Sequence, residues 1–147
     1  MKTKLFLLAL ALCSLTFYGC DDDDNNDNKL LSSSIKNFIF QKYPDARIVE
    51  VDREGSYIEV DIWHQGSARE VVFTMNEEWI WTKTDVRFDE LPEAVKTAYY
   101  NSGYTNYRID DIDHYDTPTG EYYIFEFDHE PHDIYLKIYP NGSIGEL

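Results

Sequence analysis

The sequence predicts an α+β fold in which one curved antiparallel sheet carries helices on one face and leaves its second face open. Three observations lead to this prediction. Tyrosine and phenylalanine are abundant, with 12 and 8 residues in a chain of 147, and aromatic residues favour strands. Several segments alternate between apolar and polar residues, as a strand with one buried face does. Two stretches, 33–52 and 91–113, also resemble each other.

The similarity between these two stretches indicates a tandem duplication of a unit of about sixty residues. Ile35 corresponds to Val95, and Val51 corresponds to Ile112, with small shifts of register at loops. Each copy has the same order of elements, a helix followed by about four antiparallel strands. The predicted units are residues 30–84 and residues 85–147.

The first unit begins with a predicted helix that runs to about Lys42. Ser33 or Ser34 is expected to cap it, because a serine hydroxyl can accept a hydrogen bond from a free backbone N–H of the first turn. Tyr43-Pro44 ends the helix, since the residue before a proline avoids helical geometry. A short strand, Arg47 to Asp52, is predicted next.

The remaining strands of the first unit are predicted from alternation. In the segment Tyr57 to His64, Ile58, Val60 and Ile62 are expected to face the helix, while Tyr57 and Trp63 point away. Two further strands, Glu70 to Thr74 and Trp79 to Thr82, follow after turns. Trp79 and Trp81 are expected to share one face of the sheet, and the pattern leaves open which face that is.

The second unit repeats this order. Its helix is expected to have Asp89 or Glu90 as its cap, Pro92 in its first turn and Gly103 just past its last turn. Its strands end in an Asn141-Gly142 turn. The side chains expected on the core face are Tyr123, Phe125, Phe127, Leu136, Ile138 and Ile144.

The second unit carries the pattern Leu91-Pro92-x-x-Val95-Lys96, then a Tyr-x-Phe-x-Phe strand and the final Asn-Gly turn. This pattern resembles the PepSY-like family of exported Bacteroidetes proteins, whose fold is related to that of beta-lactamase inhibitor proteins. The resemblance covers residues 30–147. The first unit departs from it, with three serines in place of Leu-Pro and Glu77 where Gly142 stands. The resemblance implies a two-copy fold and a binding role, and supplies neither a ligand nor a catalytic motif.

The first nineteen residues have the features of a lipoprotein signal peptide. Lys2 and Lys4 precede a short apolar stretch, and the segment Phe17-Tyr18-Gly19-Cys20 resembles the bacterial lipobox. In that motif the cysteine is acylated, so Cys20 is the expected lipid attachment site. The expected location is the bacterial cell envelope, on the periplasmic or surface face of the outer membrane.

Residues 20–29 are predicted to be an acidic tether. Asp21 to Asn28 contains no apolar residue and cannot join a core. A cation site would need alternating carboxylates, a glycine and a closing acid, which this run lacks. A cysteine followed by acids also resembles the export signal of Bacteroidetes surface lipoproteins, so an address remains the alternative to a plain spacer.

Charge and motifs exclude several classes of function. The formal net charge of −15 repels nucleic acid phosphates, so nucleic acid is not an expected partner. There is no Gly-x-Ser-x-Gly sequence and no phosphate-binding glycine loop, and the mature chain keeps no cysteine but Cys20. We therefore expect no catalytic residues and no cofactor.

One segment could nevertheless hold a metal ion. Asp128, His129 and His132 lie close together in the sequence, and imidazole and carboxylate groups suit zinc or similar ions. The segment Asp128 to Asp133 also joins two predicted strands, and Pro131 fits a turn, so a polar loop is the alternative. If these groups converge, a small metal-dependent hydrolase or metal-binding protein is the second hypothesis for function.

The first hypothesis is a non-enzymatic, envelope-anchored module that binds a protein through the open face of its sheet. Aromatic and aliphatic side chains exposed together on a rigid sheet suit such a partner. The sequence does not distinguish this from a structural envelope protein whose open face is covered. The residues expected on the binding face are Tyr57, Trp63, Val72, Ile124 and Tyr135.

Overall fold

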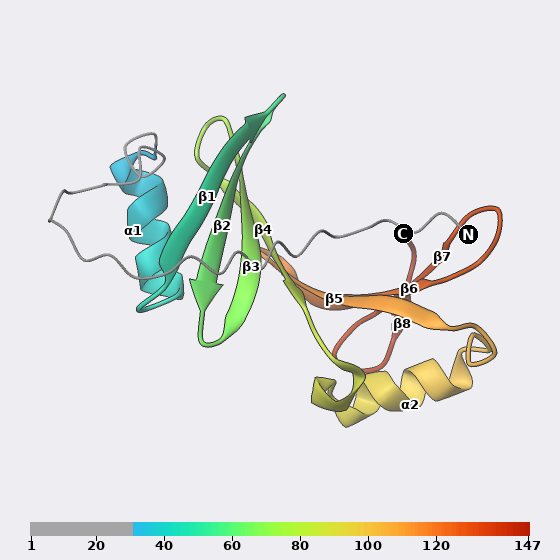
Figure 1. The fold of residues 1–147 in the computed structure, drawn as a ribbon. Helices are drawn as coiled ribbons and strands as arrows, with labels where there is room; N and C mark the ends of the chain where they lie inside the picture. Colours follow the sequence, from blue (N-terminus) through green and yellow to red (C-terminus); the bar gives the residue numbers. More distant parts are fainter. Residues whose placement is uncertain (1–30) are drawn as a thin grey trace, which may run out of the picture.

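The computed structural model describes residues 31–147 and contains one eight-stranded antiparallel sheet with two α-helices (Figure 1). The α+β class and the single sheet are therefore confirmed. The predicted signal peptide, Cys20 and the acidic tether lie outside the described residues. Among residues 31–147, no helix is long and apolar enough to cross a bilayer.

The elements are α1 (Ser33–Lys42), β1 (Arg47–Glu54), β2 (Tyr57–His64), β3 (Ser67–Thr74), β4 (Trp79–Asp85), the 3₁₀-helix η2 (Phe88–Glu90), α2 (Glu93–Asn101), β5 (Ile109–Thr117), β6 (Gly120–Phe127), β7 (Ile134–Ile138) and β8 (Ile144–Gly145).

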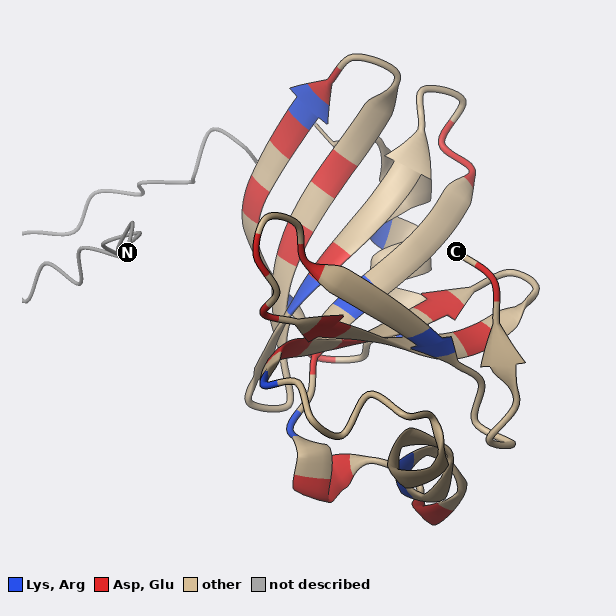
Figure 2. Ribbon diagram, turned by 90° about the vertical axis from the view of Figure 1, so that its right-hand side faces the viewer, with Lys and Arg blue, Asp and Glu red and all other residues tan. Residues whose placement is uncertain are grey.

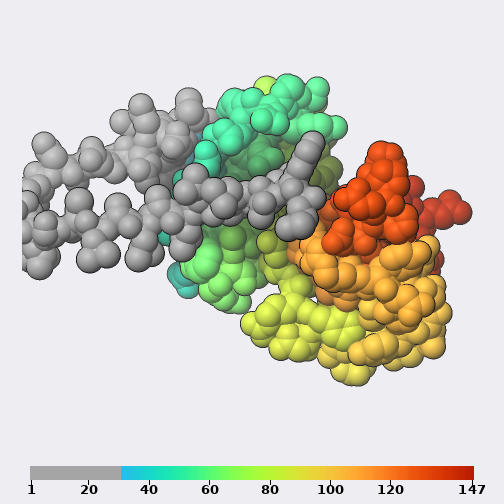
Figure 3. All heavy atoms as spheres, turned by 45° about the vertical axis from the view of Figure 1, so that its right-hand side comes forward, coloured from blue at the N-terminus to red at the C-terminus, as the bar shows by residue number. Residues whose placement is uncertain are grey.

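Each strand pairs with the next one along the chain, in the order β1 to β8. Each α-helix precedes four strands. The two groups of strands join where β4 pairs with β5 between residues 82–85 and 113–116. Figure 1 shows the two groups turned relative to each other, and Figure 3 shows them as adjoining lobes, green for β1–β4 and orange to red for β5–β8.

Both α-helices pack on the same face of the sheet. The Tyr43 hydroxyl, at the end of α1, donates a hydrogen bond to Thr82 Oγ1 at 2.8 Å. Lys42 Nζ lies 2.7 Å from Asp116 Oδ2. Thr82 and Asp116 are direct partners across β4 and β5, so the face under α1 continues into β5. Ile112, an even number of residues from Asp116, lies on that face in the core under α2.

Two hydrophobic cores fill the space between this face and the helices. Under α1, Ile35 and Ile39 pack against Ile58, Val60 and Ile62, the residues that alternation assigned to this side. Under α2, Val95 and Tyr99 contact the second core. The predicted core residues of the second unit that are buried there are Phe125, Phe127, Leu136 and Ile138, and Tyr123 is partly buried.

Both predicted helix starts are displaced in the structure. The cap of α1 is Ser32, whose hydroxyl accepts a hydrogen bond from Ile35 N at 3.2 Å, and the assignment of Ser33 or Ser34 is therefore wrong. Asp89 and Glu90 do not cap α2, because both belong to η2.

Pro92 itself is the cap of α2, so it does not lie within the first turn. Leu91, the residue before the proline, has extended backbone angles. Pro92 itself has a ψ of 145°, which is not helical, so the helix begins after it.

A β-bulge in β4 separates the two tryptophans that alternation placed on one face. Val72 pairs with Trp81 and Phe73 pairs with Trp79, which leaves Ile80 as an extra residue. Trp79 packs under α1 against Phe38, with ring centroids 5.2 Å apart. Trp81 lies on the opposite face.

Ile144 also differs from the expectation, because its side chain is 54% exposed. It lies on β8, which has only two residues, beside α2. So short a strand does not close the core at this edge of the sheet.

Candidate functional site

Neither α-helix covers the second face of the sheet, which we call the open face. Four of its side chains form a continuous row across β4, β5, β6 and the end of β7. The centroids of Trp81 and Tyr115 are 5.5 Å apart, those of Tyr115 and Tyr122 are 5.1 Å apart and stacked, and those of Tyr122 and Tyr139 are 6.4 Å apart. We call these four residues the aromatic row.

The row follows from strand pairing. Tyr115 is the direct partner of Tyr122 across β5 and β6, so their rings face each other. Lys137 on β7 places its Nζ 4.2 Å from the Tyr122 ring centroid, a favourable cation–π geometry. These contacts fix the orientation of the rings before any partner binds.

The phenols of Tyr115 and Tyr122 are neutral at physiological pH. Burial raises the pKa of Tyr115 to about 12, and the nearby Asp113 carboxylate adds to the effect. Burial also raises the pKa of Tyr122, with a contribution from Tyr139. The row therefore offers apolar ring surface together with hydroxyl groups that can donate or accept hydrogen bonds.

A hollow of about 480 Å³ adjoins the row on the open face. Tyr135 closes part of it, and its hydroxyl donates a hydrogen bond to Glu126 Oε1 at 3.2 Å. The hollow combines apolar walls with both charge signs, as binding sites commonly do. Its lining residues are Asp113, Tyr115, Tyr122, Ile124, Glu126, Tyr135, Lys137 and Leu147.

Acidic residues dominate the other half of the open face, on β1 to β3. Figure 2 shows them as red bands along β1 and β2. By strand register Asp52 pairs with Glu59, and Asp61 pairs with Glu70, so the carboxylates stand side by side. Lys83 lies between these acids and the aromatic row, with Nζ 3.0 Å from Glu70 Oε2.

These carboxylates are incompletely neutralised. Burial raises the pKa of Glu59, and the charges of Glu70 and Asp61 raise it further. Burial raises the pKa of Asp61 as well, and the neighbouring acids raise it further. For Lys83, burial lowers the pKa, but its hydrogen bond and charge interaction with Glu70 outweigh burial and raise it overall.

The predicted face residues are only partly gathered. Ile124 and Tyr135 line the hollow. Tyr57 and Trp63 are 53% and 47% exposed, but they occupy opposite ends of β2. Val72 lies on the open face, yet it is only 4% exposed, so its expected exposure is wrong.

Sequence reasoning missed the four residues of the aromatic row, for two different reasons. The face of Trp81 could not be predicted, because it depends on the bulge at Ile80, and no glycine or other turn residue in the sequence indicates that bulge. Tyr122 and Tyr139 could have been found, because the assignment of Tyr123 and Ile138 to the core face sends their neighbours to the other face. Tyr115, like Trp81, depends on pairing between strands, because it joins the row opposite Tyr122.

The structure does not bring the proposed metal ligands together. Asp128 accepts a hydrogen bond from Arg108 Nη2 at 2.6 Å. The Nδ1 atom of His129 lies 3.3 Å from the backbone oxygen of His132, and its ring packs edge-on against Tyr107. Among residues 31–147, no group of potential metal ligands includes Asp128, His129 or His132.

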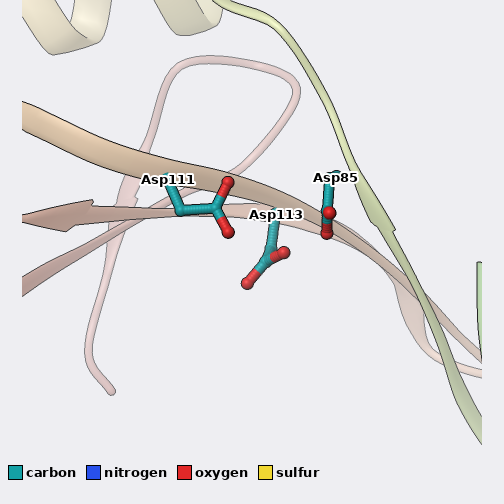
Figure 4. A group of neighbouring side chains, drawn as sticks. All are labelled: Asp85, Asp111 and Asp113. Carbon is teal, nitrogen blue, oxygen red and sulfur yellow. The ribbon is translucent and has the colours of Figure 1, made fainter. Parts of the chain in front are cut away.

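Among residues 31–147, the only three acid or histidine side chains close enough to share an ion are Asp85, Asp111 and Asp113 (Figure 4). Their ligand atoms lie within 4.8 Å of one another, and two of the three residues are exposed. Burial raises the pKa of Asp113 to about 6; Lys83 opposes this effect, whereas Asp111 and Asp85 add to it. The group is a point of charge repulsion on the strands that join the two halves.

Solved structures share this fold. A BLIP-like protein from Bacteroides fragilis is 24% identical, with a TM-score of 0.71 over 82% of this chain and 89% of that one. A DUF2874 family protein from Bacteroides uniformis is 21% identical, with a TM-score of 0.67 over 78% and 86%. A protein from Bacteroides eggerthii, described among "putative periplasmic proteins", is 21% identical, with a TM-score of 0.65 over 77% and 84%.

Sequence comparison gives the family directly. No curated protein matches the chain significantly. The family model described as "Putative beta-lactamase-inhibitor-like, PepSY-like" matches residues 24–65 and 56–145, and together these segments span most of the sequence. The chain therefore belongs to the PepSY-like family.

Proposed function

We propose that this protein is a non-enzymatic binding module of the bacterial cell envelope that engages a protein partner through its open face. The observation that carries the proposal is the aromatic row, an ordered surface of four rings in mutual contact on a rigid sheet. The beta-lactamase-inhibitor-like description of the family supports a role that depends on binding another protein.

Photo-cross-linking tests the role of the open face. Tyr139, 36% exposed at the end of the aromatic row, would be replaced by a benzophenone amino acid in the full chain. The control places the same group at Tyr100, which is 63% exposed on α2, on the helix side. We expect irradiation of native envelopes to give one defined protein adduct from position 139 and none from position 100. Equal adducts from both positions, or none from position 139, would contradict the proposal.

A second variant checks that such an adduct reflects binding by the row. Trp81→Ala removes the ring at the far end of the row while leaving position 139 intact. We expect the adduct from position 139 to be lost in this background, with the circular dichroism spectrum of the folded protein retained. An adduct that persists at full yield would mean that the row is not the contact surface.

Anchoring through a lipid on Cys20 is the second part of the proposal. It is supported by the lipobox-like segment 17–20, and the description of the Bacteroides eggerthii structure is compatible with export. Cys20→Ser should move the protein from the membrane fraction to the soluble envelope fraction. Retention of the serine variant on membranes would exclude this anchor.

We also propose that the two halves arose by duplication of one helix-plus-four-strand unit. The repeated order of elements and the presence of one core under each helix support this proposal. It predicts corresponding buried positions, and Ile35 and Val95, both about one turn inside their helices, are such a pair. Superposition of residues 31–84 on 85–147 in crystal structures of related chains tests it, and a mismatch of the helix relative to its strands would refute it.

A further inference from the structure

The open face has two chemically different parts lying side by side. The aromatic row occupies β4 to β7, where the cluster of Asp85, Asp111 and Asp113 also lies, and carboxylates predominate on β1 to β3. Of the described residues, three cations lie on this face: Lys83 is engaged with Glu70, Lys137 with the Tyr122 ring, and Arg47 lies opposite Trp63 at one end of β1. These cations are outnumbered by the acids. The acids on this face at β1 to β3 are Glu50, Asp52, Glu54, Glu59, Asp61 and Glu70.

We infer that the partner of the open face is a protein surface that presents Lys or Arg side chains beside an apolar patch. This inference rests on the proposed function and adds the chemistry of the partner. The aromatic row accounts for the apolar patch, and charge complementarity with the adjoining carboxylates accounts for the cations.

The cost of covering the acids favours this partner over others. A neutral or acidic surface laid over Glu59 and Asp61 would remove water from carboxylates and return no opposite charge, which is strongly unfavourable. A second copy of this chain, docked face to face, would bring the same acids together. The acids therefore select against such partners, while the aromatic row supplies contact area.

The strand order also sets the spacing that the partner must match. Glu59 and Asp61 are on β2, and Trp81 is on β4. Neighbouring strands are about 4.8 Å apart, so two strand spacings separate the acids from the row by roughly 10 Å. A matching partner places its cationic side chains about that far from the near edge of its apolar patch, the edge that meets Trp81.

Two synthetic peptides serve as probes of this chemistry, one of alternating Lys and Tyr and one of alternating Glu and Tyr. Their binding to the full chain would be measured by calorimetry. We expect the Lys-Tyr peptide to bind and the Glu-Tyr peptide to give no heat. Equal binding of both peptides would contradict the inference that the partner is cationic. If Trp81→Ala then abolished the binding of both peptides, the proposed function would still stand, but the inference about the partner's charge would not.

Matched variants separate the open face from the overall charge. Glu59→Gln with Asp61→Asn removes two charges from the open face, whereas Asp45→Asn with Glu93→Gln removes two from turns and helix ends on the helix side. The first pair should weaken Lys-Tyr binding about tenfold and the second less than about twofold, because only the first pair contacts the peptide. An equal loss in both pairs would overturn the inference, since net charge alone would then explain binding.

The proposed function has a separate point of failure in the same assay. If the Lys-Tyr peptide binds equally well to the native chain, to Trp81→Ala and to Tyr139→Ala, the aromatic row takes no part. That result would contradict the proposed function and, with it, this inference.

Discussion

The side chain of His64 is buried at 7% exposure, and neither of its ring nitrogens has a hydrogen-bond partner. Its ring packs edge-on against Tyr43 at a centroid distance of 5.5 Å, in the core under α1. A buried polar group without a partner costs more free energy than an apolar group of similar volume. This position therefore lowers the stability of the fold.

We expect His64→Leu to raise the free energy of unfolding by about 1 kcal/mol, because it removes two unsatisfied polar atoms from the core. His114→Leu is the control, since His114 Nε2 lies 2.9 Å from Glu121 Oε2 and its substitution should lower stability. Urea unfolding monitored by tryptophan fluorescence gives both values. A destabilised His64→Leu protein would show that the ring nitrogens are satisfied in solution.

Gly142 combines a backbone requirement with a close approach to α2. Its φ is +85°, and a Cβ atom added there would lie 2.9 Å from the backbone oxygen of Ala94. Gly66 has the same φ but open space around it, so Gly66→Ala isolates the backbone penalty, about 1 kcal/mol. In urea unfolding, Gly142→Ala should lower the free energy of unfolding by about 1–2 kcal/mol more than Gly66→Ala does, because the turn and α2 must move apart. Equal losses of stability in the two variants would mean that α2 can shift away from the added methyl group at no cost in free energy.

At the scale of elements, the sequence predicts β2 and β6 well because each alternates over its full length against a buried face. The bounds of β2 agree with the structure, as do the buried sides of Ile58 and Phe125. The prediction fails where pairing between strands decides the outcome. The bulge at Ile80 turns Trp81 to the open face, and pairing of β5 with β6 assembles the aromatic row. Such long-range pairing leaves no local signal in one strand.

The strands β4 and β5 carry the acids whose titration should be visible in the stability of the protein. Burial raises the folded-state pKa of Asp113 from its usual 3.8 to about 6. Because this pKa is raised, the group favours folding below about pH 4, and that contribution is lost as the pH rises through about 6. Asp113→Asn removes this dependence.

We therefore expect the free energy of unfolding of Asp113→Asn to equal that of the native chain near pH 4. Near pH 8 it should be higher by about 1 kcal/mol, after allowing for solvent screening. Unfolding free energies at a series of pH values give the difference. Asp45→Asn, on an exposed turn, is the control for the removal of one surface carboxylate. A native chain more stable than Asp113→Asn at pH 8 would mean that Lys83 outweighs the buried repulsion.

At the scale of the whole molecule, a formal net charge of −15 acts on a fold whose two cores are joined through one strand pair. The acids are close together in the folded state and farther apart in the unfolded chain, so their repulsion opposes folding. The ion pair between Lys42 and Asp116, which links α1 to β5, acts in the opposite direction. The change in the free energy of unfolding with salt concentration measures the balance of these attractive and repulsive interactions.

We expect sodium chloride to stabilise the protein, by about 1 kcal/mol between about 0.01 M and 0.5 M, because the screening length falls from about 30 Å to a few ångströms. Urea unfolding at both salt concentrations measures the change. The variant with Glu59→Gln and Asp61→Asn should be more stable at low salt and respond less to added salt, because two of the repelling charges on the open face are gone. Stability that falls with salt would show that attraction between pairs such as Lys42 and Asp116 outweighs the repulsion, and it would weaken the argument that the acids of the open face are incompletely neutralised.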